Sequence, residues 1–495
     1  MSKPSVQKLS FVEKAGYSLG DGAANFVFQT MILFQLNFYT DTMGIVAAVA
    51  GSLLLVGRLW DAFFDPMMGL MADRTNTRWG KFRPWVLWTA LPWGAVMVVA
   101  YTTPNLSAAG KIVYACVTNV MLMTLYSANN TPYSAMTGVM TGDVNERTSL
   151  SSYRFVAAMV AQLIVGGFTL PLVAKFGHGD NAKGWQMTMG LWASICVVLF
   201  VITFLTTRER IQPDPKQKSD ARKDFSTLLA TGPWVAMFIL TLAHFAVLAM
   251  RGGTLSYYFQ YYVNHDRLFD LLTTVGLANP SGHGAWSYFL NTFGLVVDPK
   301  HTNVASVGFS FFNMSSQFVT VIGVLCSTFL SMKFGKKAVA IVGFSLTTIF
   351  MAMFAFIPPD SVGSIFLLEY VRALTYAPTI PLIWSMYADV VDYSEWKTGR
   401  RITGVIYATI IFGLKFGLSL GGAMAGWLLS GFGYRANAVQ TPESLNGIRL
   451  TISLFPTVLF VVVIVCLVCY KIGRQLNLQI QDELAERRKG FAPAG

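Results

Sequence analysis

Long apolar runs, separated by short polar segments, recur along the whole chain. Windows of about 19 residues find them at 17–40, 45–72, 85–103, 112–136, 151–174, 186–206, 233–258, 304–330, 338–357, 364–388, 403–430 and 448–471. Each run is long enough to cross the roughly 30 Å hydrocarbon core of a bilayer as an α-helix. The pattern therefore predicts an all-α integral membrane protein with twelve transmembrane helices.

The composition supports a membrane protein and argues against a soluble enzyme. Of the 495 residues, 54% are hydrophobic and only 13% are charged, where a soluble protein carries roughly 25% charged residues. The net charge of +12 is an orientation signal and not a mark of nucleic-acid binding. With both termini cytoplasmic, the inner segments hold 26 Lys and Arg residues, counting Arg154 and Lys471 at the inner edges of their spans, and the outer segments hold six. This asymmetry predicts a multi-pass membrane protein with both termini cytoplasmic.

The start of the chain argues against a signal peptide, and the five cysteines argue against disulfide bonds or a zinc site. Residues 1–22 lack the short apolar core and cleavage site of a signal peptide, so we interpret them as a cytoplasmic lead into the first span. The cysteines all lie inside apolar runs, so neither a disulfide framework nor a zinc site is indicated. Three histidines at 265, 283 and 301 are widely and irregularly spaced, which argues against a metal site there.

A charged, proline-containing segment near the middle of the sequence divides the chain into two halves. The segment 206–226 combines proline with many charges, which is typical of a linker, so we expect halves at 1–206 and 233–472 around a linker at 207–232. A polar external loop at 259–303 and a cytoplasmic tail at 473–495 complete the division. The turns 78–81 (RWGK) and 333–336 (KFGK) follow the second span of each half, which favours an internal repeat.

The second span carries the most informative set of charged residues. Arg58, Asp61 and Asp65 are spaced i, i+3 and i+7, which places them on one helical face. Two carboxylates in a membrane can share a proton or supply oxygen ligands to a small cation, so we expect a cation site that also includes Asn25. The alternative is an intramembrane ion pair that only fastens helices together.

A second polar set has the chemistry of a sugar site. Asn130 and Tyr133 end the fourth span, Arg154 begins the fifth, and Asp21 lies one turn before Asn25 in the first span. Amides, aromatic rings and a guanidinium grip sugar hydroxyls and stack on sugar faces. Lys415 joins this predicted substrate site, because it lies in mid-span with no acidic residue nearby in its own helix. The alternatives are bonding between helices for these residues, an interfacial position for Asp21 and snorkelling for Lys415.

Charged residues in two inner loops suggest a gate. Asp143 and Arg147 lie in one loop, and Asp389, Asp392, Arg400 and Arg401 lie in or beside the corresponding loop of the second half. Ion pairs that break and reform between such loops could hold the inner side closed. The alternative is a pair of solvated loops.

These residues give the chain a family resemblance. The segments 39–41 (YTD), 58–66 (RLWDAFFDP), 78–85 (RWGKFRPW) and 389–397 (DVVDYSEWK), followed by Lys415, resemble the glycoside-pentoside-hexuronide:cation symporters, the melibiose permease family of the major facilitator superfamily. The resemblance covers nearly the whole chain. It implies the major facilitator fold of two six-helix halves. It also implies cation binding by Asp61 and Asp65 and contributions of Arg154 and Lys415 to the sugar and cation sites.

At two positions the chain differs from the family pattern, and these differences change the expected substrate and coupling ion. Asn130 and Asn25 stand where melibiose permease has acidic residues in spans four and one. The loss of two acids while Arg154 and Lys415 remain makes the site more positive, which would tolerate a uronide or another anionic sugar. Fewer anionic ligands also weaken the case for sodium, so we expect the coupling ion to be a proton.

The sequence thus predicts a secondary active symporter that imports a sugar or glycoside with a cation by alternating access. Its expected partners are the sugar, the coupling ion and the lipid bilayer, with no cofactor, no nucleic acid and a monomeric state. Alternatives are a lysolipid carrier of the same fold and an integral-membrane enzyme, although no nucleotide-binding, HExxH or Ser/His/Asp motif supports an enzyme.

Overall fold

The computed structural model describes residues 8–141, 144–210, 232–277, 284–399 and 403–489. Within these ranges the regular elements are all helices, and the only β-type pairing is an isolated bridge between Thr77 and Gly80. The all-α prediction is therefore confirmed. The chain divides into two compact units, one formed by 1–217, 252–314 and 422–445, and the other by 218–251, 315–421 and 446–495.

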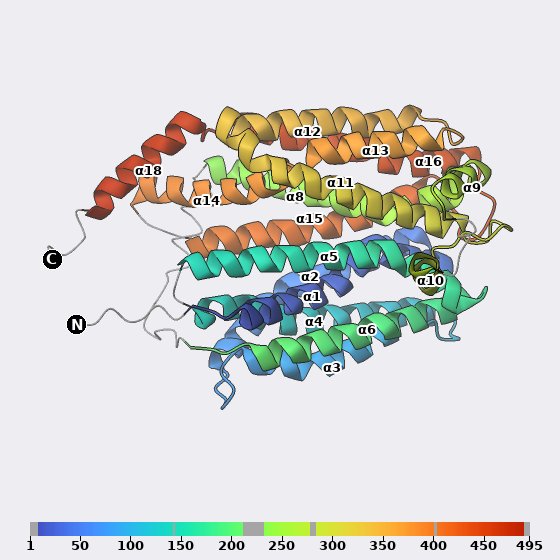
Figure 1. Cartoon of the computed structure of the whole chain (residues 1–495), viewed down its shortest axis with the longest axis horizontal. Helices are drawn as coiled ribbons and strands as arrows, with labels where there is room; N and C mark the ends of the chain where they lie inside the picture. The colour runs from blue at the N-terminus through green and yellow to red at the C-terminus, as the bar shows by residue number, and fades with distance from the viewer. Residues whose placement is uncertain (1–7, 142–143, 211–231, 278–283, 400–402, 490–495) are drawn as a thin grey trace. The chain divides into compact units, whose positions relative to one another are not determined.

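The first unit contains six helices that match the first six apolar stretches and lie side by side in Figure 1. They are α1 (Phe11–Asn37) with its π-helical extension η1 (Phe38–Thr42), α2 (Ala47–Arg74), α3 (Arg83–Ala100), α4 (Ala108–Met140), α5 (Val144–Gly177) and α6 (Asn181–Thr206). Helix α1 packs against α5 and α6, α2 packs against α4, and α3 packs against α4 and α6. Residues far apart in the sequence are thus brought together on α1, α2, α4 and α5.

The helices after α6 are distributed over both units. They are α8 (Gly232–Tyr257) with η2 (Tyr258–Tyr262), α9 (His265–Thr274), α10 (Ala285–Thr292), α11 (Val304–Phe334), α12 (Lys336–Met353) with η3 (Phe354–Phe356), α13 (Val362–Tyr376), α14 (Thr379–Thr398), α15 (Thr403–Gly431), α16 (Pro442–Ile452), α17 (Leu454–Cys469) and α18 (Arg474–Lys489). In the second unit, α12 packs against α13, α14 and α17, and α18 packs against α14.

Two predicted spans are each split into two helices. The stretch 364–388 breaks between α13 and α14 at Pro378, because proline has no N–H to donate to the preceding turn. The stretch 448–471 breaks at Ser453, and Pro456 then lies in the first turn of α17, where its missing N–H is not needed. Both breaks are proline effects within an otherwise continuous apolar run.

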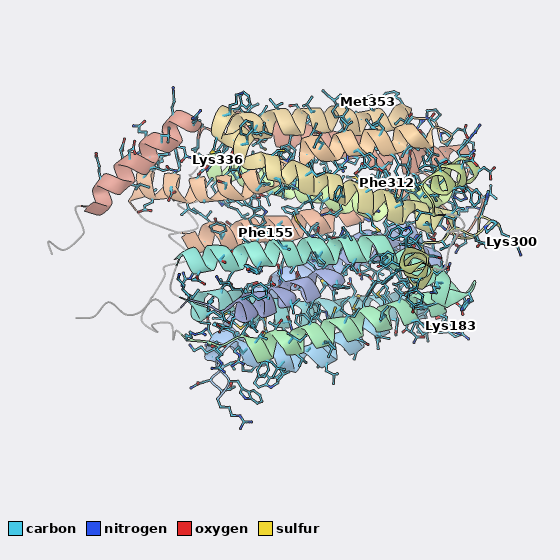
Figure 2. All side chains as sticks on the ribbon, in the orientation of Figure 1. Phe155, Lys183, Lys300, Phe312, Lys336 and Met353 are labelled. Atoms are coloured by element: carbon cyan, nitrogen blue, oxygen red, sulfur yellow. The ribbon has the colours of Figure 1, made fainter. Side chains whose placement is uncertain are left out.

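Among the described residues, nine helical segments are long and apolar enough to cross a membrane. They include α2, α4, α5 and α6 and the joined segments α8–η2, α12–η3 and α16–α17. Exposed side chains on them are often large and apolar, as Phe155 on α5 illustrates (Figure 2). The chain is thus a multi-pass membrane protein, while twelve crossings, the boundaries of the two halves and the linker at 207–232, most of which lies outside the described residues, stay predictions.

Glycines allow α15 to approach α8 very closely. A Cβ at Gly417 would collide with the carbonyl oxygen of Leu242, and one at Gly421 with that of Ala246. Small residues at a spacing of four are the usual means of close helix packing in membranes. Lys415 lies two positions from Gly417, or roughly 200° around the helix, so it points away from α8.

Candidate functional site

Three charged residues in the middle of α2 are buried or half-buried, whereas Asp73 and Arg74 at its end are exposed. Asp61 has no exposed surface, Arg58 is 7% exposed, and Asp65 is half-buried. The Arg58 guanidinium lies 5.3 Å from the ring centre of Phe28 on α1. A buried guanidinium that stacks on an aromatic ring keeps its charge close to the carboxylates without leaving the protein interior.

Helix α4 supplies hydroxyl groups to Asp65. Ser127 Oγ donates a short hydrogen bond to Asp65 Oδ1, and Thr131 Oγ1 donates to the same oxygen at 3.3 Å. Ser127 and Thr131 are four residues apart and therefore lie on one face of α4. The site around Asp65 thus contains two hydroxyl oxygens besides the carboxylate, which can either donate to it or serve as ligands to a small cation. We call Arg58, Asp61, Asp65, Ser127 and Thr131 the carboxylate cluster.

A second cluster joins α1, α4 and α5 around Arg154. Its guanidinium donates to Asp21 Oδ1 at 3.2 Å and lies 5.2 Å from the ring centre of Tyr133 and 5.8 Å from that of Tyr17. The two tyrosine rings stack on each other with their centres 4.6 Å apart. Each phenol donates to the backbone carbonyl of the other tyrosine, at 3.0 and 2.7 Å. We call these four residues the arginine–tyrosine cluster.

The side chains of Arg154 and Asp21 are 26% and 17% exposed. Partial exposure leaves guanidinium and carboxylate atoms able to bind a polar ligand, while the stacked phenols hold the guanidinium plane in position. The pair therefore offers both donors and acceptors to a polar ligand. Asp21 is paired with Arg154 from α5, while its place in a substrate site and its alternative interfacial position stay predictions.

Two predicted site residues, Asn25 and Asn130, lie beside these clusters. Asn25 Nδ2 donates to the Asp21 carbonyl at 2.8 Å, and its Oδ1 accepts from Gln162 on α5 at 3.4 Å. Asn130 Nδ2 donates to the Tyr126 hydroxyl at 3.4 Å. Asn25 is thus bonded within the α1–α5 contact next to the arginine–tyrosine cluster.

Lys415 belongs to the second unit and is half-buried in α15. The same unit contains a buried network in which Glu369 accepts from Arg251 at 2.5 Å and from Arg372 at 2.5 and 2.8 Å, with Ser316 as a third donor at 2.9 Å. Glu369 and Arg372 are three residues apart on α13 and form a local ion pair, which Arg251 from α8 joins. This network fastens α8, α11 and α13 together.

Of the gate residues, Asp143, Arg400 and Arg401 lie outside the described residues. Arg147 donates to the carbonyls of Thr141 and Gly138 at 2.9 and 3.2 Å. Asp389 accepts from Lys336, labelled in Figure 2, at 2.8 and 3.0 Å. Asp392 is half-buried on the same helix, one turn after Asp389. An ion-pair gate between the loops stays a prediction.

Four residues of the two clusters and their surroundings are not among the predicted site residues: Tyr17, Phe28, Ser127 and Thr131. Ser127 has a detectable signal, because it stands four residues before Thr131 on the polar end of the fourth span. Tyr17 and Phe28 have none, since an aromatic residue in an apolar span is ordinarily a packing residue.

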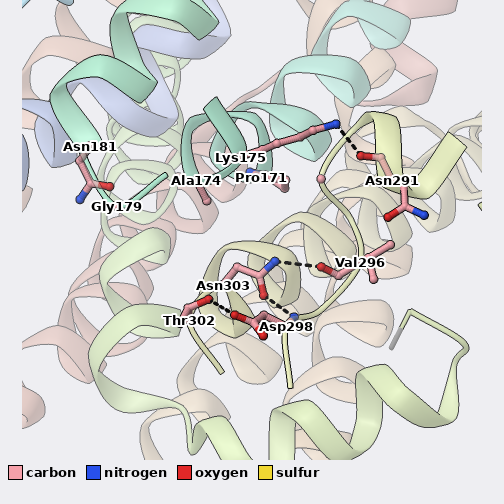
Figure 3. A pocket seen from close by; sticks show the side chains of 11 residues that line it. Pro171, Ala174, Lys175, Gly179, Asn181, Asn291, Val296, Asp298, Thr302 and Asn303 are labelled. Atoms are coloured by element: carbon pink, nitrogen blue, oxygen red, sulfur yellow. Dashed lines mark hydrogen bonds between the residues drawn. The ribbon is translucent and has the colours of Figure 1, made fainter. Parts of the chain in front are cut away.

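A pocket of about 400 Å³ lies outside both clusters (Figure 3). Its polar lining residues are bonded to one another: Lys175 Nζ donates to the Asn291 carbonyl at 2.6 Å, and Asp298 accepts from Thr302 at 2.6 Å. The Asn303 side chain bridges the Val296 carbonyl and the Asp298 amide at 2.9 and 2.8 Å. These bonds fix the loop before α11 and tie α10 to α5.

Comparison with known proteins places the chain in a family. The family model described as MFS/sugar transport protein matches residues 16–294 and 284–474, so the chain belongs to this family of the major facilitator superfamily. The inner membrane symporter YicJ of Escherichia coli K12 is 34% identical over 91% of this chain and 88% of its own length. The isoprimeverose transporter of Lactiplantibacillus pentosus is 32% identical over 93% of this chain and 89% of its own.

The fold agrees with this assignment. A crystal structure of a mutant of the nucleoside transporter NupG aligns with a TM-score of 0.64 at 13% identity, covering 93% of this chain and all of the other. Such low identity supports the major facilitator fold alone. The melibiose permease resemblance of the sequence is confirmed, and the protein is a transporter and not an enzyme.

Proposed function

We propose that this protein imports a sugar or glycoside together with a cation, by alternating access of two six-helix halves in a bacterial inner membrane with both termini cytoplasmic. Its family and its relatives, which include a symporter and an isoprimeverose transporter, support carriage of a sugar. We propose that transport needs no cofactor besides the coupling ion.

The observation that carries the proposal is the proximity of the arginine–tyrosine cluster to the carboxylate cluster through α4. Ser127 and Thr131 on α4 bond Asp65, and Tyr133 on the same helix stacks under Arg154. A rigid helix that touches both sites is suited to couple them, because a shift of α4 that improves one set of contacts alters the other. Sugar binding at Arg154 and ion binding at Asp61 and Asp65 are therefore proposed as the two coupled events.

We propose a proton as the coupling ion in preference to sodium. Asp61 is fully buried, and one carboxylate is enough to bind a proton, whereas a metal cation needs several oxygen ligands at once. Asn25 is engaged by Asp21 and Gln162 and contributes no negative charge. Both features favour a site that works by protonation.

The substrate is proposed to be a sugar or glycoside, uronides included. Asp21 offsets much of the charge of Arg154, so that pair suits neutral sugar hydroxyls. Lys415 supplies a further positive charge that an anionic sugar would need. A lysolipid carrier is not favoured, because the named relatives are a symporter and a sugar transporter.

Uptake into proteoliposomes tests the proposal. Purified protein is reconstituted, an inward proton or sodium gradient is imposed separately, and entry of labelled pentosides, glycosides and uronides is measured. At least one sugar should accumulate above its external concentration with the proton gradient and collapse with an ionophore. Accumulation driven by sodium alone would refute the proton assignment. Failure of every sugar, with uptake of lysolipid instead, would refute the substrate class.

A further inference from the structure

A third acidic site lies at the far end of α1 from the arginine–tyrosine cluster. Asp41 is in the π-helical extension η1, beyond the apolar stretch 17–40, and is 8% exposed. Its Oδ1 accepts from Thr40 at 2.7 Å and from Tyr434 by a short hydrogen bond, and its Oδ2 accepts from Tyr261 at 2.8 Å. Three hydroxyl groups therefore converge on one buried carboxyl.

The donors come from three distant parts of the chain within the first unit. Tyr261 lies in η2 after α8, and Tyr434 lies in the segment after α15. Further bonds join the same segments: Tyr257 shares a hydrogen bond with Thr40 at 2.6 Å, and Asn437 Nδ2 donates to the Asp41 carbonyl at 2.6 Å. Asp41 is the common partner that ties η1 to the ends of two later helices.

Within the part of the chain that the structure describes, the side-chain donors to this carboxyl are neutral. The titratable groups around it are the phenols of Tyr257, Tyr261 and Tyr434, and the Gln260 amide lies beside them. On adjoining elements, the Lys111 ammonium of α4 donates to the Met43 carbonyl at 3.0 Å, and Arg435 follows Tyr434 in the chain.

Burial raises the pKa of Asp41, and the hydrogen bonds from Tyr434, Thr40 and Tyr261 only partly offset that effect. Contact with water would return the pKa of this carboxyl to its ordinary value of 3.8. Burial without an opposite charge disfavours the carboxylate, whereas the three donors favour it, and burial is the larger effect. A protonated Asp41 can be accommodated, because it can donate to the Tyr434 hydroxyl, which in turn can donate to Tyr261 Oη at 3.3 Å.

We propose that Asp41 is a second proton-binding site, separate from Asp61 and Asp65, and that a proton bound there holds η1 against the segments of Tyr261 and Tyr434. The assembled state binds the proton more tightly than a state in which these segments part and Asp41 meets water. By linkage, protonation therefore favours the assembled state. The stabilisation is complete below the ordinary pKa of 3.8 and is lost as the pH rises through the raised pKa of the assembled state.

The idea that η1 separates from the segments of Tyr261 and Tyr434 rests on the proposed function, because only a transporter with alternating halves needs this contact to open. The proton site itself does not. In the expected topology this end of α1 is the outer end, so an external proton would keep the outer side closed. Protons would then bind at two separate sites of the same protein, Asp41 and the Asp61 and Asp65 pair.

The test measures the separation of the segments without any substrate. Spin labels are placed on cysteines at Val46 and Val439, which are 64% and 100% exposed, after replacement of the five native cysteines. Double electron–electron resonance should give one short distance at acidic pH and a growing longer population as the pH rises. Asp41→Asn, which resembles the protonated acid, should keep the short distance at every pH. Tyr261→Phe with Tyr434→Phe should show the longer population even at acidic pH.

A matched control and a second measurement make the outcome decisive. Tyr39→Phe removes a buried phenol two residues from Asp41 whose hydrogen bond is to Gln35, so it should retain the wild-type pH profile. Infrared spectroscopy of protein with its native cysteines should detect a carboxyl band that titrates above the range of exposed acids and disappears in Asp41→Asn but not in Asp61→Asn. A distance distribution independent of pH, or an unchanged titrating band in Asp41→Asn, would overturn the proposal whether or not any sugar is transported.

Discussion

Arg154 on α5 donates a hydrogen bond to Asp21 on α1 at 3.2 Å, across 133 residues of sequence. Each residue supplies the charge that the other needs in a membrane interior, although the two stand on different helices. Because both side chains keep some exposed surface, the pair can exchange part of its bonding for a ligand. The pair is thus the structural basis for several expectations about substrate binding.

Replacement of Arg154 by Lys should weaken sugar binding by about tenfold or more, or roughly 1.4 kcal/mol. Lysine keeps the charge but loses the planar fork that bonds Asp21 and stacks on Tyr133. Isothermal titration calorimetry with a transported sugar measures the loss. The matched control is Lys14→Arg at the Lys14–Glu146 pair, 2.9 Å apart and outside both clusters, where affinity should be unchanged. Equal affinity in wild type and Arg154→Lys would exclude the residue from the substrate site.

Replacement of Asp61 or Asp65 by Asn should abolish accumulation driven by an ion gradient but leave sugar exchange largely intact. An amide of the same size fills the space but cannot bind the coupling ion. Uptake and exchange in the same proteoliposomes separate the two effects. Asp73→Asn, at an exposed position near the end of α2, is the control and should accumulate sugar normally. Full accumulation by both single variants would refute the coupling role.

Lys415→Gln should distinguish an anionic substrate from a neutral one. If the transported sugar is a uronide, the loss of the ammonium should weaken its binding much more than that of the matching neutral glycoside. If the natural substrate is neutral, the two losses should be similar. Calorimetry with both ligands decides between these results, and undiminished binding of both would remove Lys415 from the site.

Gly421→Leu should destabilise the packing of α15 on α8, because any Cβ there meets the Ala246 backbone. Overpacking of this kind costs about 1–3 kcal/mol, which should appear as a lower unfolding temperature in detergent. Gly190→Ala in α6 is the control, since a Cβ there has no neighbour within 4 Å. Gly190→Ala should be neutral or slightly stabilising through its better helix propensity. Equal unfolding temperatures in the two variants would show that the close approach is not required.

Glu209→Ala should loosen the start of α3. The Glu209 carboxylate accepts from three successive backbone amides, Lys81 at 2.9 Å, Phe82 at 2.7 Å and Arg83 at 2.8 Å. A carboxylate at a helix N-terminus is worth about 1 kcal/mol, so its loss should speed hydrogen exchange of the amides at 81–83. Glu443→Ala, an exposed residue in the first turn of α16, should leave that exchange unchanged. Unaltered exchange at 81–83 in Glu209→Ala would contradict this role.

The sequence by itself determined which segments become helices and which charged residues share a helical face. Both depend on local patterns: an apolar run of about 20 residues must be helical in a bilayer because its backbone groups have no other partners. The spacing of Arg58, Asp61 and Asp65 likewise follows from helix geometry alone. Even the breaks at Pro378 and Ser453 are local effects of proline, although the apolar pattern alone does not reveal them.

Only the tertiary structure decided which polar residues meet. Ser127 reaches Asp65 because α2 packs on α4, and Arg154 reaches Asp21 because α5 packs on α1. Tyr434 bonds Asp41 from 393 residues away. A hydropathy pattern shows that a helix carries a polar side chain that needs a hydrogen-bond partner. It does not show which neighbouring helix supplies that partner. Which helix becomes the neighbour is decided by close packing over entire helix faces, and no single segment of sequence encodes that packing.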